Sequence, residues 1–199
     1  MAAGPDEIEL SEDELRAITG FAADCAREVL ALFERSHPAD QRPREALDAA
    51  YAFAGGGRRT AALRRCAWAA YRAGREAADP PAAGDAALAA SHAAAAAYLH
   101  PRASAHQVKH LLGAAAHAAR ARELALTEPR AGAGSAEQAD RTGDSASADG
   151  GCAAADTLAW ARRHAPGAVV AVLGRLPAAP PGGGRVGQLV RDLDAALRG

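Results

Sequence analysis

The sequence has few of the residues from which large cores and catalytic sites are commonly built. Aromatic residues make up 4% of its 199 residues, there are three cysteines, and Lys109 is the only lysine. Asparagine is absent, whereas alanine, glycine, proline and arginine are abundant, as a GC-rich coding sequence would produce. The abundance of arginine therefore does not by itself indicate that the protein binds phosphate groups.

The charge balance and the lack of long apolar segments exclude several classes of partner. The 23 basic and 24 acidic residues give a formal net charge of -1, whereas nucleic-acid and anionic-membrane binding need clustered positive charge. The chain starts with acidic residues and no apolar stretch follows, unlike a signal peptide. The alanine-rich stretch before His100 is too short and too weakly apolar to cross a bilayer. We expect no nucleic-acid or membrane partner.

The cysteines also favour a reducing compartment. Cys25, Cys66 and Cys152 are odd in number, far apart and without a C-x-x-C pair, so they form no disulfide framework. We therefore expect a cytoplasmic protein.

What the sequence does contain is alanine in long runs, which predicts an all-α fold. Alanine loses no side-chain entropy on entering a helix, and residues 93–97 and 114–116 are unbroken alanine. No stretch alternates with a period of two over the length of a strand. We predict a compact bundle of about seven to eight amphipathic helices. Trp68, His92 and His117 lie in similar alanine-rich settings, which suggests stacked helical hairpins.

Capping residues, prolines and glycines set the helix boundaries. Ser11 with Glu14, and Ser104 with Gln107, have the spacing of a capping box. We expect helices over 11–37, 43–54, 60–78, 84–99, 104–126 and 153–164, a short one around 169–173 and a last one around 186–197. The core anchors are predicted to be the large aromatic residues Phe21, Phe33, Tyr51, Phe53, Trp68, Tyr71, Tyr98 and Trp160.

The predicted organisation is one domain with two flexible parts. Residues 1–10 form a flexible acidic lead-in and residues 11–128 a helical core. Residues 129–151 are rich in Gly, Ala, Ser and Asp and lack periodicity, so they are predicted to be a disordered insertion. Residues 152–199 are predicted to form C-terminal helices that pack on the same domain.

Histidine spacing allows a metal site as an alternative. His106, His110 and His117 share one face of a helix, and the first two have the spacing at which two imidazoles bind one metal ion. His92 and His100 are near enough in sequence to add ligands. There is no H-E-x-x-H motif and no acidic residue between them on that face, so interfacial histidines are the preferred interpretation. His92 is expected to be buried and hydrogen-bonded, and we predict no cofactor.

Arginine and aromatic residues on the third predicted helix form the best candidate for a protein interface. The set is Arg58, Arg59, Arg64, Trp68, Tyr71 and Arg75. In the alternative, Trp68 and Tyr71 are core anchors and the arginines a solvated rim. The preceding Gly55–Gly57 run has neither a P-loop pattern nor a preceding strand, and no nucleophile motif occurs elsewhere. We therefore predict a protein without catalytic residues.

Acidic residues near the N-terminus form a competing surface. They are Asp6, Glu7, Glu9, Glu12, Asp13 and Glu14. Negative side chains stabilise the positive end of a helix, which is the simplest interpretation of this cluster. In the alternative, they face a basic partner.

Short stretches along most of the chain resemble one protein family. They are Leu10–Arg16, Asp40–Leu47, Gly56–Arg64, Ser91–Tyr98, His106–Gly113 and Trp160–Pro166. These stretches are similar to bacterial putative immunity proteins with an immunity-protein-5-like domain, some actinobacterial members of which are labelled exonucleases. The resemblance implies an all-helical fold and a protein that binds and neutralises a cognate toxin domain. It implies no catalytic residues.

The sequence gives the exonuclease label no support. It has no Walker motif, no carboxylate cluster that would bind a metal and no long heptad repeat. The alternatives to an immunity protein are a small helical metal-binding enzyme or sensor that uses the histidines, and a helical adaptor for protein interactions.

Overall fold

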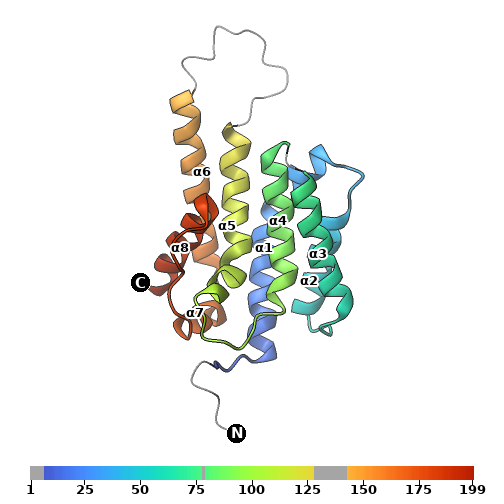
Figure 1. The fold of residues 1–199 in the computed structure, drawn as a ribbon, viewed down its shortest axis with the longest axis vertical. Helices are drawn as coiled ribbons and strands as arrows, with labels where there is room; N and C mark the ends of the chain where they lie inside the picture. The colour runs from blue at the N-terminus through green and yellow to red at the C-terminus, as the bar shows by residue number, and fades with distance from the viewer. Residues whose placement is uncertain (1–6, 78, 128–142) are drawn as a thin grey trace.

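The computed structural model describes residues 7–77, 79–127 and 143–199, and it is an all-α bundle (Figure 1). The helices are α1 (Glu12–Ser36), α2 (Arg42–Ala54), α3 (Ala61–Glu76), α4 (Pro81–Ala96), α5 (His106–Thr127), α6 (Gly143–His164), α7 (Gly167–Gly174) and α8 (Gly184–Arg198). Across these ranges there is no β-strand, only an isolated bridge between Glu7 and Arg102. Among the described helices, none combines the length and apolar character needed to cross a bilayer. The all-α prediction is confirmed.

One of the two predicted capping boxes is present. The Glu14 backbone N–H donates to Ser11 Oγ at 3.1 Å, and the Ser11 backbone N–H donates to the Glu14 carboxylate at 2.8 Å. The second prediction is wrong, because α5 begins at His106 and Gln107 Oε1 instead accepts from the His100 backbone N–H at 3.2 Å. Gln107 therefore holds the preceding loop against the start of α5.

Helix α4 lies at the centre of the bundle, packed against α1, α3 and α5 (Figure 1). Small residues let α3 approach closely: a Cβ added to Gly74 would lie 2.8 Å from the Gly84 carbonyl oxygen and equally close to Leu88 Cγ. The Ser91 hydroxyl donates to the Ala67 carbonyl of α3 at 2.9 Å. This close packing fixes which face of α3 points outward.

The C-terminal helices cover the other side of α5. Helices α6 and α8 pack on α5, while α7 contacts α1. Arg175, which follows α7, forms an ion pair with Glu14 and donates to the Glu9 carbonyl. These contacts join the C-terminal helices to the start of α1.

Parts of the two segments predicted to be flexible are helical or packed in the structure. Part of the predicted insertion over 129–151 is helical, because α6 starts at Gly143. Gly150 is buried, and a Cβ added to it would lie 3.0 Å from the Glu123 carbonyl oxygen of α5. Residues 128–142 lie outside the described residues. Residues 7–10 of the predicted lead-in also pack, since Ile8 and Leu10 contact the core and the Ile8 N–H donates to the Pro101 carbonyl at 3.3 Å.

The aromatic residues do not all serve as core anchors. Phe21, Phe33 and Phe53 are buried, while Tyr51, Tyr98 and Trp160 are partly buried against the core. Trp68 and Tyr71 are exposed, so their prediction as core anchors is wrong. Alanine and leucine side chains fill the core beneath them.

Candidate interaction surface

Two aromatic side chains lie exposed on the outer face of α3. Trp68 is 61% exposed and Tyr71 42% exposed, although most large apolar side chains of the chain are buried. Their rings meet edge to face, with centroids 5.7 Å apart and an interplanar angle of 86°. An aromatic pair of this kind exposes a large apolar area that is costly to leave in water and is typical of a protein interface.

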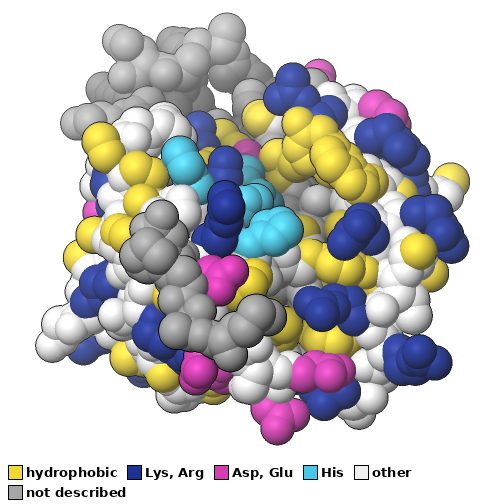
Figure 2. Space-filling model, turned by 60° about the horizontal axis from the view of Figure 1, so that its bottom comes forward, with side chains coloured by type: hydrophobic (Ala, Val, Ile, Leu, Met, Phe, Trp, Pro, Cys, Tyr) yellow, Lys and Arg dark blue, Asp and Glu magenta, His cyan; other side chains and the backbone are white. Residues whose placement is uncertain are grey.

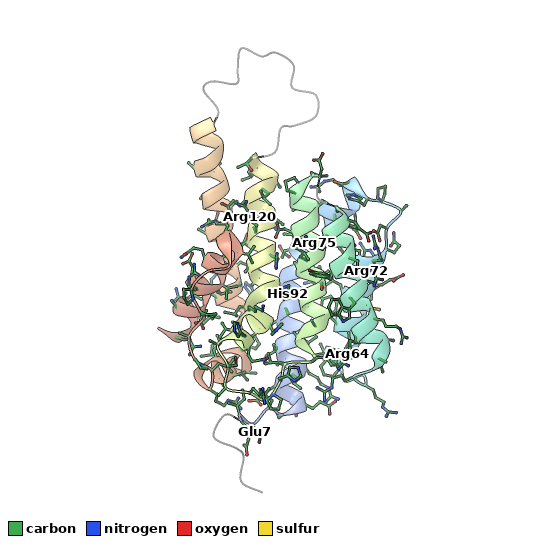
Figure 3. All side chains as sticks on the ribbon, viewed as in Figure 1. Glu7, Arg64, Arg72, Arg75, His92 and Arg120 are labelled. Carbon is green, nitrogen blue, oxygen red and sulfur yellow. The ribbon has the colours of Figure 1, made fainter. Side chains whose placement is uncertain are left out.

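Arginines flank this aromatic pair along α3 and in the segment just before it. They are Arg58, Arg59, Arg64, Arg65, Arg72 and Arg75, all exposed. Figure 3 shows Arg64, Arg72 and Arg75 along α3. Together with Trp68 and Tyr71 they form what we call the α3 face. In the described part of the chain none of the six forms an ion pair, whereas many arginines of other helices do.

The structure brings the predicted interface residues onto one surface and adds two. Arg65 and Arg72 lie three and four residues from Trp68, so they flank it on the second edge of the helix. Arg64 was predicted because it lies four residues before Trp68, and Arg75 because it lies four residues after Tyr71. The same spacing rule could have identified Arg65 and Arg72.

Tyr98 positions two of these arginines. The Arg64 guanidinium carbon lies 4.4 Å from the centroid of the Tyr98 ring, and that of Arg59 lies 5.8 Å away. Arg59 Nη1 donates to the Ala97 carbonyl at 3.1 Å, and the Tyr98 hydroxyl donates to the Thr60 carbonyl. Cation–π contacts of this type restrict the guanidinium groups before a partner arrives.

The acidic residue at the end of α3 does not neutralise this face. Arg42 Nη2 lies 2.6 Å from Glu76 and 2.6 Å from Asp40, so both carboxylates are bound to an arginine of α2. The hydrogen bonds from Arg42 lower the pKa values of both carboxyl groups. The α3 face is therefore strongly positive although the whole chain has a formal net charge of -1.

Three histidines gather where α4 and α5 meet. The His92 ring stacks on His117 with centroids 5.0 Å apart, and its centroid lies 6.5 Å from that of His110. His117 Nδ1 lies 2.6 Å from Asp85 Oδ1. Figure 3 shows His92 between the two helices. The spacing along α5 predicted that His110 and His117 lie on one face. The position of His92 beside them depends on how α4 packs against α5.

Burial disfavours the protonated forms of His92 and His110. Desolvation, followed by the positive charges of neighbouring groups, lowers the pKa of His92 to about 3, and the same causes lower that of His110. His92 Nδ1 is buried and has no hydrogen-bond partner among the described residues, so the expected hydrogen bond is not made by this nitrogen.

The four candidate metal ligands do not all lie in one cluster. His106 and His100 are exposed at the start of α5 and in the loop before it, apart from the stacked rings of His92 and His117. Within the residues that the structure describes, no three or more His, Cys, Asp or Glu side chains are arranged to hold an ion. The alternative set of His106, His110, His92 and His100 therefore does not converge on one point.

The acidic residues of the first turn of α1 bind arginines of the same chain. Glu12 and Asp13 pair with Arg16, at 2.6 and 3.3 Å, and Glu14 pairs with Arg175. The bond from Arg175 is the main reason that the pKa of Glu14 is lowered. These internal pairs reduce the charge that the competing acidic surface could present to a basic partner.

A hollow lies between α1, α5 and α6. It is lined by Cys25, Trp160 and the ion pair between Arg122 and Glu28, whose charged atoms lie 3.2 Å apart. Burial raises the pKa of the Cys25 thiol, so the reactive thiolate is disfavoured there. The α3 face remains the surface with the clearest chemical character.

Comparison with known proteins identifies one family. The chain matches no curated protein and no solved structure closely enough to carry an argument. The model of the family described as "Imm-5 like putative immunity protein" matches residues 9–144, which contain α1 to α5. Because this match covers more than half of the chain, the protein belongs to the Imm-5 like putative immunity protein family.

Proposed function

We propose that this protein is a cytoplasmic immunity protein that binds a cognate toxin domain through the α3 face and neutralises it without catalysis. The observation that carries this proposal is the exposed pair of Trp68 and Tyr71, surrounded by arginines that form no ion pair with another residue of the described ranges. Tryptophan, tyrosine and arginine are the residue types most enriched among those that dominate binding energy at protein interfaces.

The charge of the α3 face selects an acidic partner. Arginine guanidinium groups form short, often bidentate hydrogen bonds with carboxylates, and complementary charge increases the rate of association. A second copy of the chain is a poor partner for this face. A two-fold interface centred on Trp68 would place arginines such as Arg64 and Arg75 against the same residues of the other copy.

The position of the α3 face also supports the proposal. The family match contains α1 to α5, and α7 and α8 lie outside it. Helices α6 and α8 pack on α5, away from α3. The α3 face is thus part of the matched region and is left open by the C-terminal helices.

The proposal is tested by recovering the partner from the native host. The tagged protein is isolated, its stoichiometric partners are identified by mass spectrometry, and bound metal is measured on the same sample. The recovered toxin domain is then produced with and without this protein, and its toxicity is scored. We expect the wild-type protein to protect cells and to form a one-to-one complex.

A charge-reversal pair locates the binding surface. Arg64→Glu with Arg75→Glu should weaken the complex at least tenfold, because both changes repel an acidic partner. Arg162→Glu with Arg163→Glu is the matched control, since both arginines are exposed on α6 and the change in net charge is the same. Equal affinity of the two double variants would reject the α3 face.

The same variants test a nucleic-acid partner. Arginine and tryptophan also bind single-stranded DNA by phosphate contacts and base stacking. Tight binding of a 15-nucleotide single strand to the wild type, lost in the Arg64→Glu, Arg75→Glu variant, would reject a protein toxin as the partner of this face.

A further inference from the structure

Helix α4 has a single partly exposed strip, which runs between α3 and α5. The strip consists of Asp85, Leu88, His92 and Ala95, at steps of three and four residues. The remaining described side chains of α4 from Ala82 to Ala96 are buried, and α4 packs against α1, α2, α3 and α5. The strip therefore forms the middle of a three-helix surface, with the α3 face along one edge.

Basic and histidine side chains line the other edge of the strip. Lys109 is exposed on α5, and His110 and His117 are partly exposed on the same helix. Figure 2 shows histidine side chains gathered on this side of the molecule beside Lys and Arg, with hydrophobic side chains next to further Lys and Arg. Asp85 is the acidic residue of the strip, and it is bound to His117. Both edges therefore favour negative charge.

The dimensions of the strip match those of one helix. Packed helices lie about 8–10 Å apart, so α3 and α5 lie at most roughly twice that distance from each other across α4. A helix with its side chains is about 10–12 Å wide. Such a helix can rest on the small side chain of Ala95 and on Leu88 while its flanks reach both edges.

We propose that the partner places an acidic α-helix along the α4 strip, with carboxylates toward Arg64 and Arg75 on one side and toward Lys109 and His110 on the other. This inference rests on the proposed function, because it specifies what the toxin presents to the α3 face. It extends the interface to α4 and α5, which the residues of α3 alone do not indicate. The helix buries its apolar side against Leu88 and Ala95, as in other helix-in-groove complexes.

The histidines make this contact dependent on pH. The titratable and charged groups around His110 are Lys109, His106 and His117 on α5, His92 and Asp85 on α4, and His100 in the preceding loop. Burial, followed by the positive charges of Lys109 and the neighbouring histidines, lowers the pKa of His110 in the free protein. A carboxylate beside His110 offsets that repulsion, and the complex takes up a proton. Binding therefore becomes tighter as the pH falls.

A pair of substitutions at one position tests the acidic helix. Ala95→Glu and Ala95→Lys add side chains of similar length and opposite charge to the middle of the strip. The affinity of each for the toxin domain recovered with the wild type is measured by calorimetry, after circular dichroism has confirmed the same helicity. We expect Ala95→Glu to weaken binding roughly tenfold or more and Ala95→Lys to change it by less than about threefold.

A histidine variant tests the second edge. For the wild type, affinity for the same toxin domain should increase about fivefold from pH 7.5 to pH 6.0, and proton uptake should appear in buffers of different ionisation enthalpy. His110→Gln should remove most of this proton uptake without changing the affinity at pH 7.5 by more than about threefold.

The outcomes separate this inference from the proposed function. If Arg64→Glu with Arg75→Glu weakens binding but both Ala95 variants bind like the wild type, the function stands and the α4 strip is not covered. If Ala95→Glu and Ala95→Lys weaken binding equally, the strip is covered by a helix that is not acidic, and the inference is wrong. If none of these variants affects binding, both the face and the strip are excluded.

Discussion

The ring of His92 occupies the space that a side chain at Gly113 would need. A Cβ added to Gly113 would lie 2.5 Å from His92 Nδ1 and 2.9 Å from Cε1. Gly113 belongs to α5 and His92 to α4, so the absence of one side chain lets the other lie between the helices. The stacking of His92 on His117 depends on this arrangement.

Substitution of Gly113 by alanine should therefore destabilise the fold. Separation of α4 and α5, or rotation of His92 away from His117, would relieve the contact, and overpacking of this kind costs about 1–3 kcal/mol. Urea denaturation measures the change in the free energy of unfolding. Gly151→Ala on α6 is the control, because a Cβ there meets nothing within 4 Å, and alanine is favoured over glycine in a helix by up to about 1 kcal/mol. Equal stability of the two variants would show that His92 moves without cost.

The buried His92 should make stability depend on pH. Its pKa is lowered from 6.5 to about 3 in the folded protein, so between these values the unfolded chain binds a proton that the folded chain does not. The free energy of unfolding is therefore unaffected by His92 above about pH 6.5. Below that pH it decreases by up to about 1.4 kcal/mol per pH unit. Between pH 7 and pH 5 the loss amounts to about 2 kcal/mol.

The measurement compares the wild type with His92→Gln. Free energies of unfolding are obtained from urea titrations at intervals from pH 8 to pH 4.5, with pH 7–8 as the baseline. We expect the wild type to lose about 2 kcal/mol more than the variant between pH 7 and pH 5, since glutamine does not titrate. Parallel curves for the two proteins would mean that His92 is protonated in the folded state as readily as in the unfolded chain.

Features that depend on neighbouring residues of the sequence were predictable, and features that depend on helix packing were not. The capping box of Ser11 and Glu14 joins residues three apart, so its spacing is visible in the sequence, although the same spacing at Ser104 and Gln107 forms no box. The exposure of Trp68 could not be predicted in this way, because a buried stripe and an exposed interface have the same helical spacing. Only the contact of α3 with α4 through Gly74 and Gly84 decides which face points outward.

The start of α6 illustrates the same limit. Glycine, serine and aspartate dominate residues 143–151, and their weak helix propensity favoured a loop. The helix instead packs against α5. At Gly150 the two helices are so close that an added Cβ would lie 3.0 Å from the Glu123 carbonyl oxygen. Tertiary packing of this kind overrides local propensity. The histidines themselves stood out in the sequence, but the stacking of His92 on His117 was not predicted, since it joins two helices.

The close approach of α3 and α4 gives a third prediction. A Cβ on Gly84 would lie 2.7 Å from the Ala77 carbonyl oxygen and 3.0 Å from that of Gly74, and backbone atoms cannot rotate away. Gly84→Ala should therefore lower the free energy of unfolding by about 1–3 kcal/mol and reduce the melting temperature. Gly20→Ala on α1 is the control, because its Cβ would meet Ala54 at an ordinary 3.4 Å. A Gly84→Ala protein as stable as the Gly20→Ala protein would contradict the packing described here.

The two tryptophans should separate binding from stability. Trp68 is exposed on α3, whereas Trp160 is partly buried against the core and stacks on His164 with ring centroids 4.3 Å apart. Trp68→Ala should leave the free energy of unfolding within about 0.5 kcal/mol of the wild type, as for other surface substitutions. It should weaken binding of the toxin domain by about 2 kcal/mol or more if Trp68 is a central interface anchor.

Trp160→Ala should show the opposite pattern, a lower free energy of unfolding with nearly unchanged affinity for the toxin domain under native conditions. Chemical denaturation and calorimetry on the same preparations measure both quantities. A large loss of stability in Trp68→Ala would mean that the ring supports the fold of α3. Unchanged affinity would mean that the partner does not contact it. Only loss of affinity with intact stability fits an aromatic pair that is exposed because a partner covers it.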